Sequence, residues 1–240
     1  MPPLKAAFKK LPQPVQETTK GAIRRLISPY GRARLGAGIE PLSYTWGSDR
    51  GTEIARHYVE EEFLKEFSGD VRGHVMEFFG DDYIVRYGGK KVSKVDILNL
   101  EEGNEKATII GQDLTKPNTI PSNAFDCVIC THVLHVIYDF DAAIADLYRI
   151  LKPGGVLLIA VPLVSMCDPA WHELWRFTRE GLQLALEKSF KKSDVTMRFY
   201  GNSLTAAGQL RGLVAHEFST RTLKKHDERF AVEICGRAVK

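Results

Sequence analysis

Three histidines lie in segments where acid–base chemistry is expected. His132 directly follows an apolar run at 125–131, and His135 comes three residues later, which helical spacing would place on the same face. His172 lies in the segment DPAWHELWRFT, after the next apolar run. Because a neutral imidazole can take up a proton near pH 7, we expect His132 as the first candidate general base and His172 as the second. The alternative for His132 is packing against a cofactor or helix capping, and for His172 it is a histidine of a surface loop. For His135 we favour a structural packing role.

Aromatic residues cluster beside His172. Trp171, Trp175 and Phe177 could form a wall against a ring or a sugar face, although plain packing is an equally good interpretation. Asp81 and Asp82 form a carboxylate pair, but no histidine or third acid stands at ligand spacing from them. We therefore expect this pair to cap a short helix and predict no metal site.

Two of the four cysteines, Cys127 and Cys130, form a C-x-x-C motif of the kind that zinc sites and redox proteins use. They lie inside the apolar run FDCVICTHVL, with no second pair to accompany them, so small core residues are the favoured interpretation. With no secretory signal pattern, a reducing cytoplasm is the expected location. No apolar run approaches the roughly 20 residues of a membrane span, so we predict no transmembrane segment.

The elements that must position these residues alternate between strand and helix. Apolar runs predict seven strands, at 74–79, 90–100, 107–114, 125–137 (running into a helix start), 156–162, 194–202 and 229–239. Helical periodicity predicts helices at 49–67, 139–151, 178–190 (with Thr178 as N-cap) and 204–218. This alternation predicts an α/β fold, a doubly wound, mostly parallel sheet with helices on both faces. Because ligands bind at the carboxyl ends of such strands, the loops after the first four strands should surround one crevice.

The N-terminal segment differs from the rest in charge and composition. Residues 1–45 carry eight basic and two acidic residues and six prolines, whereas residues 46–240 are mildly acidic. We interpret 1–45 as a basic arm with one amphipathic helix, which docks a partner or a second copy, touches a membrane surface or packs on its own domain. The acidic balance of 46–240 gives no reason to expect nucleic-acid binding there.

Residues 113–162 carry several motifs in a fixed order. An acidic residue, Asp113, precedes a proline-containing loop, followed by F-D-x-V at 125–128, a small polar pair before V-L-x-H, and L-x-R-x-L-K-P-G-G at 147–155. W-R-F-T-x-x-G-L follows at 175–182. This order resembles the class I, Rossmann-like methyltransferases of the type 11 group. The resemblance implies the seven-stranded sheet of that class and S-adenosylmethionine as cofactor.

The resemblance also implies roles for particular residues. Asp96, at the end of the predicted second strand, matches the acid that accepts hydrogen bonds from the ribose hydroxyls. Asp113 matches the acid that receives the adenine amino group, with the backbone of Leu114 beside it. Glu77 matches the acid that ends the first strand, and Thr131 lies where the family lines the methionine part of the cofactor.

Two residues upstream could cover the cofactor. Arg50 and Tyr58 lie on the predicted helix before the first strand, where they could act as a lid over the cofactor carboxylate. A surface arginine and a core tyrosine are the alternatives.

The glycine-rich motif of the family is degenerate here. The family has an acid followed by G-x-G-x-G, but aligned on Glu77 this chain has Phe79 at the first glycine and Asp81 at the second, and keeps only Gly80. Glycines let backbone approach a cofactor, so Phe79 either crowds the cofactor or the loop takes another course. A shortened E-x-x-G-D-x-x-Y segment shared by some family members would make this a subfamily feature.

These observations favour methyl transfer to a small molecule or a sugar, most readily at oxygen. Such a reaction needs alignment, exclusion of water and, for a hydroxyl, a nearby base. Two alternatives remain open: a methyltransferase-like protein that only binds or scaffolds, and a biosynthetic enzyme such as a cyclase that uses His132 or His172 as acid or base.

Overall fold

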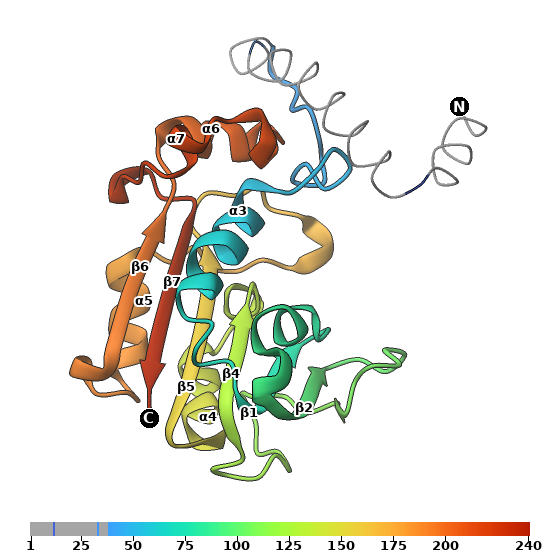
Figure 1. Ribbon diagram of the computed structural model, residues 1–240, viewed down its shortest axis with the longest axis vertical. Coiled ribbons are helices and arrows are strands. Elements are labelled where there is room, and N and C mark those ends of the chain that lie inside the picture. Colours follow the sequence, from blue (N-terminus) through green and yellow to red (C-terminus); the bar gives the residue numbers. More distant parts are fainter. Residues whose placement is uncertain (1–11, 13–32, 34–37) are drawn as a thin grey trace.

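A seven-stranded sheet forms the centre of the molecule. The computed structural model describes residues 38–240, together with the single positions 12 and 33 (Figure 1). The strand order is β3-β2-β1-β4-β5-β7-β6. The first five strands pair in parallel, and β7 is antiparallel to both β5 and β6. The strands are β1 (Gly73–Phe78), β2 (Val92–Asn99), β3 (Ile109–Ile110), β4 (Phe125–Thr131), β5 (Leu151–Pro162), β6 (Val195–Tyr200) and β7 (Glu233–Val239). The predicted mostly parallel sheet is confirmed.

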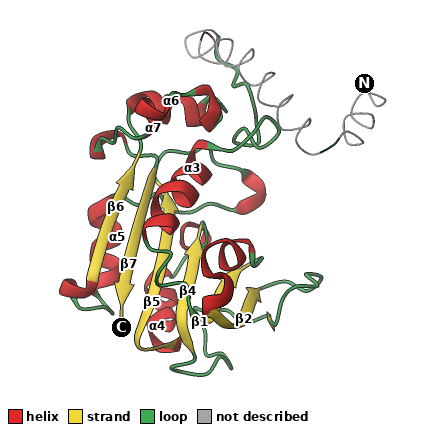
Figure 2. Ribbon diagram, in the orientation of Figure 1, coloured by secondary structure: helices red, strands yellow, loops and turns green. Residues whose placement is uncertain are grey.

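Helices cover both faces of this sheet (Figure 2). On one face lie α4 (Phe140–Ile150) and α5 (Arg179–Glu187), and on the other α3 (Ile54–His57), the π-helix η2 (Tyr58–Leu64) that continues it, α6 (Ser203–Leu210) and α7 (Thr220–Leu223). Shorter turns complete the chain: η3 (Ile84–Gly88), η4 (Gly89–Lys91), η5 (Leu134–Val136), η6 (Pro169–Trp171), η7 (Lys192–Asp194), η8 (Ala215–Glu217) and η9 (Glu228–Phe230).

The two faces of the sheet bury alternate residues of the same strands. Cys127 packs in the core under α3, and Cys130 packs in the core under α4. Because helices cover both faces, the strands are apolar throughout rather than in every second position. Both cysteines are free and buried, which confirms that they are core residues. The predicted cap is also confirmed, since the Thr178 hydroxyl accepts a hydrogen bond from Gly181 N at 3.1 Å.

Several predicted elements have different bounds. The third strand is only two residues long, because Gly111 turns the chain with a φ of +70°. The helix predicted at 204–218 ends at Leu210, and Gly212 (φ +69°) then presses against Ser43, which leaves no room for a side chain. The fourth strand ends in a 3₁₀ turn instead of a helix.

Residues 38–47 lie against the segment that follows α6. Leu42 N donates to Arg211 O at 2.8 Å, and the Arg211 guanidinium donates to Gly38 O at 2.8 Å. The amphipathic helix expected within 1–45 lies outside the described residues, and its role in partner or membrane contact stays a prediction. No helix among the described residues is long and apolar enough to cross a membrane.

Candidate active site

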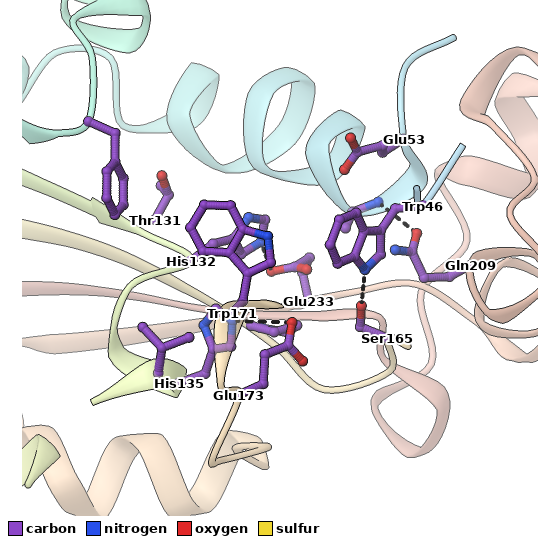
Figure 3. Close-up of a pocket in the computed structure, with 14 residues that line it drawn as sticks. Trp46, Glu53, Thr131, His132, His135, Ser165, Trp171, Glu173, Gln209 and Glu233 are labelled. Carbon is purple, nitrogen blue, oxygen red and sulfur yellow. Dashed lines mark hydrogen bonds and ion pairs between the residues drawn. The ribbon is translucent and has the colours of Figure 1, made fainter. Parts of the chain in front are cut away.

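A pocket of about 270 Å³ opens at the carboxyl edge of the sheet (Figure 3). Its floor is formed by residues that end or directly follow β1, β4 and β5: Phe79, Thr131, His132 and Pro162. Because β7 runs in the opposite direction, its first residue, Glu233, lies at the same edge. The remaining walls come from the start of α3, from α6, and from segments near the N-terminus and after β4 and β5: Trp46, Glu53, Ala55, His135, Val136, Ser165, Trp171, Glu173 and Gln209.

A histidine and a carboxylate meet at the bottom of this pocket. His132 Nε2 lies 3.2 Å from Glu233 Oε2. The Glu233 side chain is fully buried, and neither of its oxygens makes a hydrogen bond of good geometry to any described residue. Burial lowers the pKa of His132, but the negative charge of Glu233, with smaller contributions from Glu53 and Glu173, more than offsets this and raises the pKa above its usual value.

The backbone of His132 is strained into a left-handed conformation. Its φ is +54°, a region that costs a non-glycine residue roughly 1–3 kcal/mol and that occurs often at functional sites. His132 N donates to Ala160 O on β5 at 2.9 Å, which fixes this conformation. The strand end thus aims the imidazole toward Glu233.

A second histidine packs behind the first. His135 is buried, and burial, together with the charge of His132, lowers the pKa of His135 to about 3. His135 is therefore neutral at physiological pH. Its Nε2 lies 3.7 Å from Glu173, whose carboxylate also forms an ion pair with Arg176. The backbone of His135 accepts hydrogen bonds from Leu174 N and Trp175 N, in keeping with the structural role favoured for it.

Aromatic side chains surround the opening. Trp46 Nε1 donates to Ser165 Oγ at 3.0 Å, which ties the segment before α3 to the loop after β5. Trp171 meets the Phe79 ring edge-to-face, with the ring centroids 6.4 Å apart. Both rings are about half exposed, so they border the pocket without filling it.

The turn after β1 has a backbone conformation typical of glycine, although the residue there is Phe79. Phe79 has a φ of +66°, a conformation that glycine adopts without strain. Glu77 is turned away from the pocket, and its carboxylate accepts hydrogen bonds from Ile84 N at 2.9 Å and Tyr83 N at 3.4 Å. Burial raises the pKa of Glu77 to about 7. Glu77 therefore stabilises the turn, and its carboxylate is not placed for a direct contact with a cofactor. Nothing lies within 4 Å of the position that a side chain on Gly80 would take.

Asp96 is not at the end of the second strand, as its predicted role requires. β2 continues to Asn99, and Asp96 pairs with Met76 in the middle of the sheet. Its carboxylate lies 2.6 Å from His74 Nε2 and 2.8 Å from Thr108 Oγ1, with Lys94 at 3.1 Å. Asp96 therefore lies inside the strand, and its expected place at the strand end is wrong. The polar partners around its carboxylate allow an acid at this position.

Other acids follow the second and third strands. Glu101 comes two residues after the end of β2 and is exposed. Asp113 follows β3 by three residues, and its Oδ1 accepts hydrogen bonds from Thr115 N and Thr115 Oγ1 at 2.9 and 2.7 Å. These bonds lower the pKa of Asp113. Leu114 is buried in the core, so only its backbone is a candidate for base contacts.

Neither member of the predicted lid reaches the pocket. The Arg50 guanidinium donates to Gly212 O at 2.9 Å and forms an ion pair with Glu217. Tyr58 is fully buried and stacks on Tyr200, with the ring centroids 6.0 Å apart. The structure thus favours the core-tyrosine alternative, and the segment that covers this pocket begins with Trp46 and Glu53 instead.

The predicted aromatic wall and the second base are also only partly in place. Trp171 lines the pocket, whereas Trp175 donates through Nε1 to Ile137 O at 2.9 Å and Phe177 is buried against Phe140. His172 is exposed in a left-handed turn outside the pocket lining. Trp175 and Phe177 are therefore packing residues, and His132 remains as the candidate base.

Sequence reasoning missed the carboxylates and the amide that complete the pocket. Glu53 is the N-cap of α3, Glu233 begins the last strand, and Glu173 lies midway between Trp171 and Trp175. Gln209 is buried near the end of α6, where its side chain accepts a hydrogen bond from Ala55 N at 3.2 Å. The one signal for Glu233 was an acid inside the apolar run RFAVEICGRAV, where a charge is expected only if it has a function or a partner.

Comparison with known proteins finds methyltransferases. Residues 82–159 match a family model described as a methyltransferase domain, of the type 11 group. The chain is 29% identical over 131 residues to "Ubiquinone/menaquinone biosynthesis C-methyltransferase UbiE" of Pasteurella multocida, which is 47% of this chain and 49% of the relative. It is 27% identical over 121 residues to "Demethylmenaquinone methyltransferase" of Listeria monocytogenes, covering 50% and 47%. The chain spans about half the length of the curated relatives it matches.

Solved structures share the fold at low sequence identity. "StiE O-MT residues 961-1257" has a TM-score of 0.52 at 13% identity, covering 84% of this chain and 83% of that one. A putative S-adenosylmethionine-dependent methyltransferase from Listeria monocytogenes has a TM-score of 0.51 at 14% identity, covering 78% and 99%. The sheet order, the helices on both faces and these likenesses define the fold of a class I methyltransferase. Over residues 82–159 the chain matches the methyltransferase domain of the type 11 group, in agreement with the resemblance seen in the sequence.

Proposed function

We propose that this protein is an S-adenosylmethionine-dependent methyltransferase that acts on a small molecule, most readily at a hydroxyl oxygen. The observation that carries the proposal is the His132–Glu233 pair, which lies in a pocket at the carboxyl edge of a class I methyltransferase sheet. In such sheets this edge is where ligands bind.

The residues beside the pocket fit the cofactor. Phe79 keeps the left-handed backbone of a glycine turn, and the backbone at Gly80 is open to a ligand. Exposed or half-exposed carboxylates follow the neighbouring strands, Glu101 after β2 and Asp113 after β3, where they would hold the ribose hydroxyls and the adenine amino group. Thr131 would line the methionine part. When bound, the cofactor supplies an electrophilic methyl group on sulfur, so the protein needs no electrophile of its own.

His132 acts as the general base in this mechanism. Its Nε2 is buried against Glu233, which leaves Nδ1 as the nitrogen that would take the proton from an acceptor hydroxyl. As the imidazole becomes positively charged, the carboxylate of Glu233 stabilises it. Glu233 also orients the ring, as the carboxylate of a hydrolytic triad does for its histidine.

The walls of the pocket exclude water and orient the acceptor. Trp46 and Trp171 border the opening with large apolar faces, and Gln209 and Glu53 present polar atoms from α6 and α3. Figure 3 shows these side chains arranged around His132 and Glu233. A pocket of about 270 Å³ fits a single ring or a short branched acceptor group better than a polymer.

Calorimetry with S-adenosylmethionine and with its demethylated product tests the cofactor part. We expect micromolar binding of both, weakened about tenfold in Glu101→Gln, which loses one charged hydrogen bond to the ribose. Exposed Glu180→Gln is the matched control. Absence of heat at high micromolar ligand would refute the methyltransferase proposal and leave the alternative of a protein that only binds or scaffolds.

Turnover with a panel of alcohols, sugars, phenols and amines then tests the catalytic part. The demethylated cofactor is the readout, and His132→Ala should lower kcat by about 10²–10⁴. His172→Ala, outside the pocket, should leave kcat unchanged. A His132→Ala enzyme of normal rate would exclude His132 as the base.

A further inference from the structure

The charged side chains that line the pocket are mostly acidic. Its lining contains three carboxylates, Glu53, Glu173 and Glu233, and no described lining residue is Lys or Arg. Among the described lining residues, only His132 and His135 could carry positive charge, and the low pKa of His135 keeps it neutral. An anionic acceptor would therefore meet repulsion in this pocket, whereas a cationic one would be attracted.

Two of the three carboxylates already have a counter-charge. Glu173 forms an ion pair with Arg176, and Glu233 lies beside His132. Glu53 makes no hydrogen bond or ion pair that the described part of the structure records. The nearby Arg56 is occupied by Glu60, with Nε to Oε1 at 2.6 Å. Burial raises the pKa of Glu53, and the charges of His132 and Arg56 offset this effect only in part.

Buried polar atoms without hydrogen bonds point into the same space. Glu233 is fully buried and lines the pocket; its Oε2 lies 3.2 Å from His132 Nε2, and its Oε1 has no hydrogen-bond donor among the described residues. A buried carboxylate oxygen without a donor is costly, so a ligand that supplies donors would be favoured here. An ammonium group supplies three donors and a positive charge together.

The aromatic side chains of the opening suit the same group. Trp46 and Trp171 lie on two sides of the pocket that Glu53 borders (Figure 3). The face of an indole attracts a cation by about 0.5–2 kcal/mol, and indole is the best of the aromatic side chains for this. Carboxylates combined with indole faces are the chemistry that recognises an organic ammonium ion.

From these contacts we infer that the acceptor carries a positively charged amine, which Glu53 and the indole rings bind while a hydroxyl of the same molecule faces His132. Amino alcohols and amino sugars are the class that this description fits. The identity of the molecule as an acceptor rests on the proposed function, but the preference for a cation belongs to the pocket alone.

Three probes of one size and different charge test the preference. Benzylamine, benzyl alcohol and benzoate share a ring and differ only in carrying a positive, a neutral or a negative group. Binding of each to the full chain without cofactor, at pH 7.5 and low salt, is measured by ligand-observed NMR titration. We expect benzylamine to bind about tenfold more tightly than benzyl alcohol, with benzoate weakest.

Two variants connect the preference to the residue. Glu53→Gln should lose most of the tenfold preference for benzylamine and keep the affinity for benzyl alcohol, whereas Glu180→Gln, exposed on α5, should change neither. Equal or tighter binding of benzyl alcohol or benzoate to the wild-type protein overturns the inference, as does the absence of benzylamine binding. An unchanged preference in a folded Glu53→Gln protein overturns the role of Glu53.

The outcome separates this inference from the proposed function. Failure to bind S-adenosylmethionine would end the methyltransferase proposal and leave the order of the three probes as it is. Failure of the probe order would end the ammonium inference and leave cofactor binding and turnover as they are.

Discussion

Replacing Glu233 by glutamine is the sharpest perturbation of the candidate base. The change keeps the shape of the side chain and removes its charge, 3.2 Å from His132 Nε2. Glu233 begins β7 between Pro162 on β5 and Tyr200 on β6, so the backbone pairing that holds it does not depend on the carboxylate. The variant should therefore fold, and its effect should fall on His132.

The size of the effect follows from the distance and the burial. Two unit charges 3.2 Å apart attract by about 5 kcal/mol at an effective dielectric constant of about 20. The loss of hydration of the buried Glu233 offsets much of this, and solvent screens the His132 side chain, which is 36% exposed. A net stabilisation of the charged imidazole by about 1–3 kcal/mol remains. The reaction should therefore slow by about tenfold to a hundredfold when the charge is removed.

The direction of the pH dependence gives an independent readout. Glu233 is the main group that raises the pKa of His132 against the opposing effect of burial, and Glu53 and Glu173 contribute less. His135, the other titratable group packed against the ring, is neutral because burial lowers its pKa to about 3. In Glu233→Gln the pKa of His132 should fall, so the acid limb of the pH–kcat profile should move to lower pH while the maximum rate decreases.

NMR titration of the histidine ring protons measures this pKa without any acceptor. His132→Asn identifies the resonance, and Glu180→Gln controls for loss of a surface charge. An unchanged or raised pKa of His132 in a folded Glu233→Gln protein would refute the pairing. An unchanged pH profile and kcat, with the pKa lowered, would refute the role of His132 as base.

Three further predictions concern the sheet and the turn after β1. Asp96→Asn should lower the free energy of unfolding by about 1–3 kcal/mol, because it weakens the contact with His74; urea denaturation measures this. The same variant should leave cofactor affinity unchanged in calorimetry, in contrast to Glu101→Gln. Phe79→Gly should be more stable than Phe79→Ala by about 1 kcal/mol, since only glycine relieves the φ of +66°, and thermal melts compare the two. Because burial raises the pKa of Glu77 from 4.5 to about 7, the folded state binds more protons than the unfolded state between these values. The contribution of Glu77 to stability should be full below pH 4.5 and fall as pH rises through 7, by up to roughly 3 kcal/mol, and Glu77→Gln should remove this slope in urea titrations from pH 4 to pH 8.

The sheet could be predicted because its signal is repeated. Each strand is an apolar run, and each face is buried by helices whose apolar stripes have a period of 3.6 residues. In α4, for example, Ala143, Ile144, Leu147 and Ile150 recur at helical spacing and are all fully buried in the structure. The ends of elements carry a weaker signal, so the strand predicted at 107–114 is only two residues long. The match to the family assigns Asp96 to a strand end, whereas the strand continues for three more residues.

The pocket was only partly predictable, because it is assembled from many separate segments. Thr131 and His132, at the end of a parallel strand, could be placed at the edge of the sheet from the order of elements. Glu53 and Glu233 are 180 positions apart, and what brings them together is the antiparallel direction of β7 and the way α3 crosses the sheet. No local pattern encodes that meeting, and the loop residue Trp171 reached the pocket while Trp175 turned to the core.

Phe79 stands where the family has a glycine, and it is best understood as altering the wall of the pocket, not as abolishing function. A glycine cradle needs a left-handed backbone, and Phe79 retains it at a cost of about 1–2 kcal/mol. The Phe79 ring is half exposed and contacts Trp171, so it adds an aromatic surface to the opening of the pocket. Because nothing crowds the backbone at Gly80, the path along the turn stays open. On the proposed function, Phe79 would therefore add a wall beside the acceptor and leave the turn open to the cofactor.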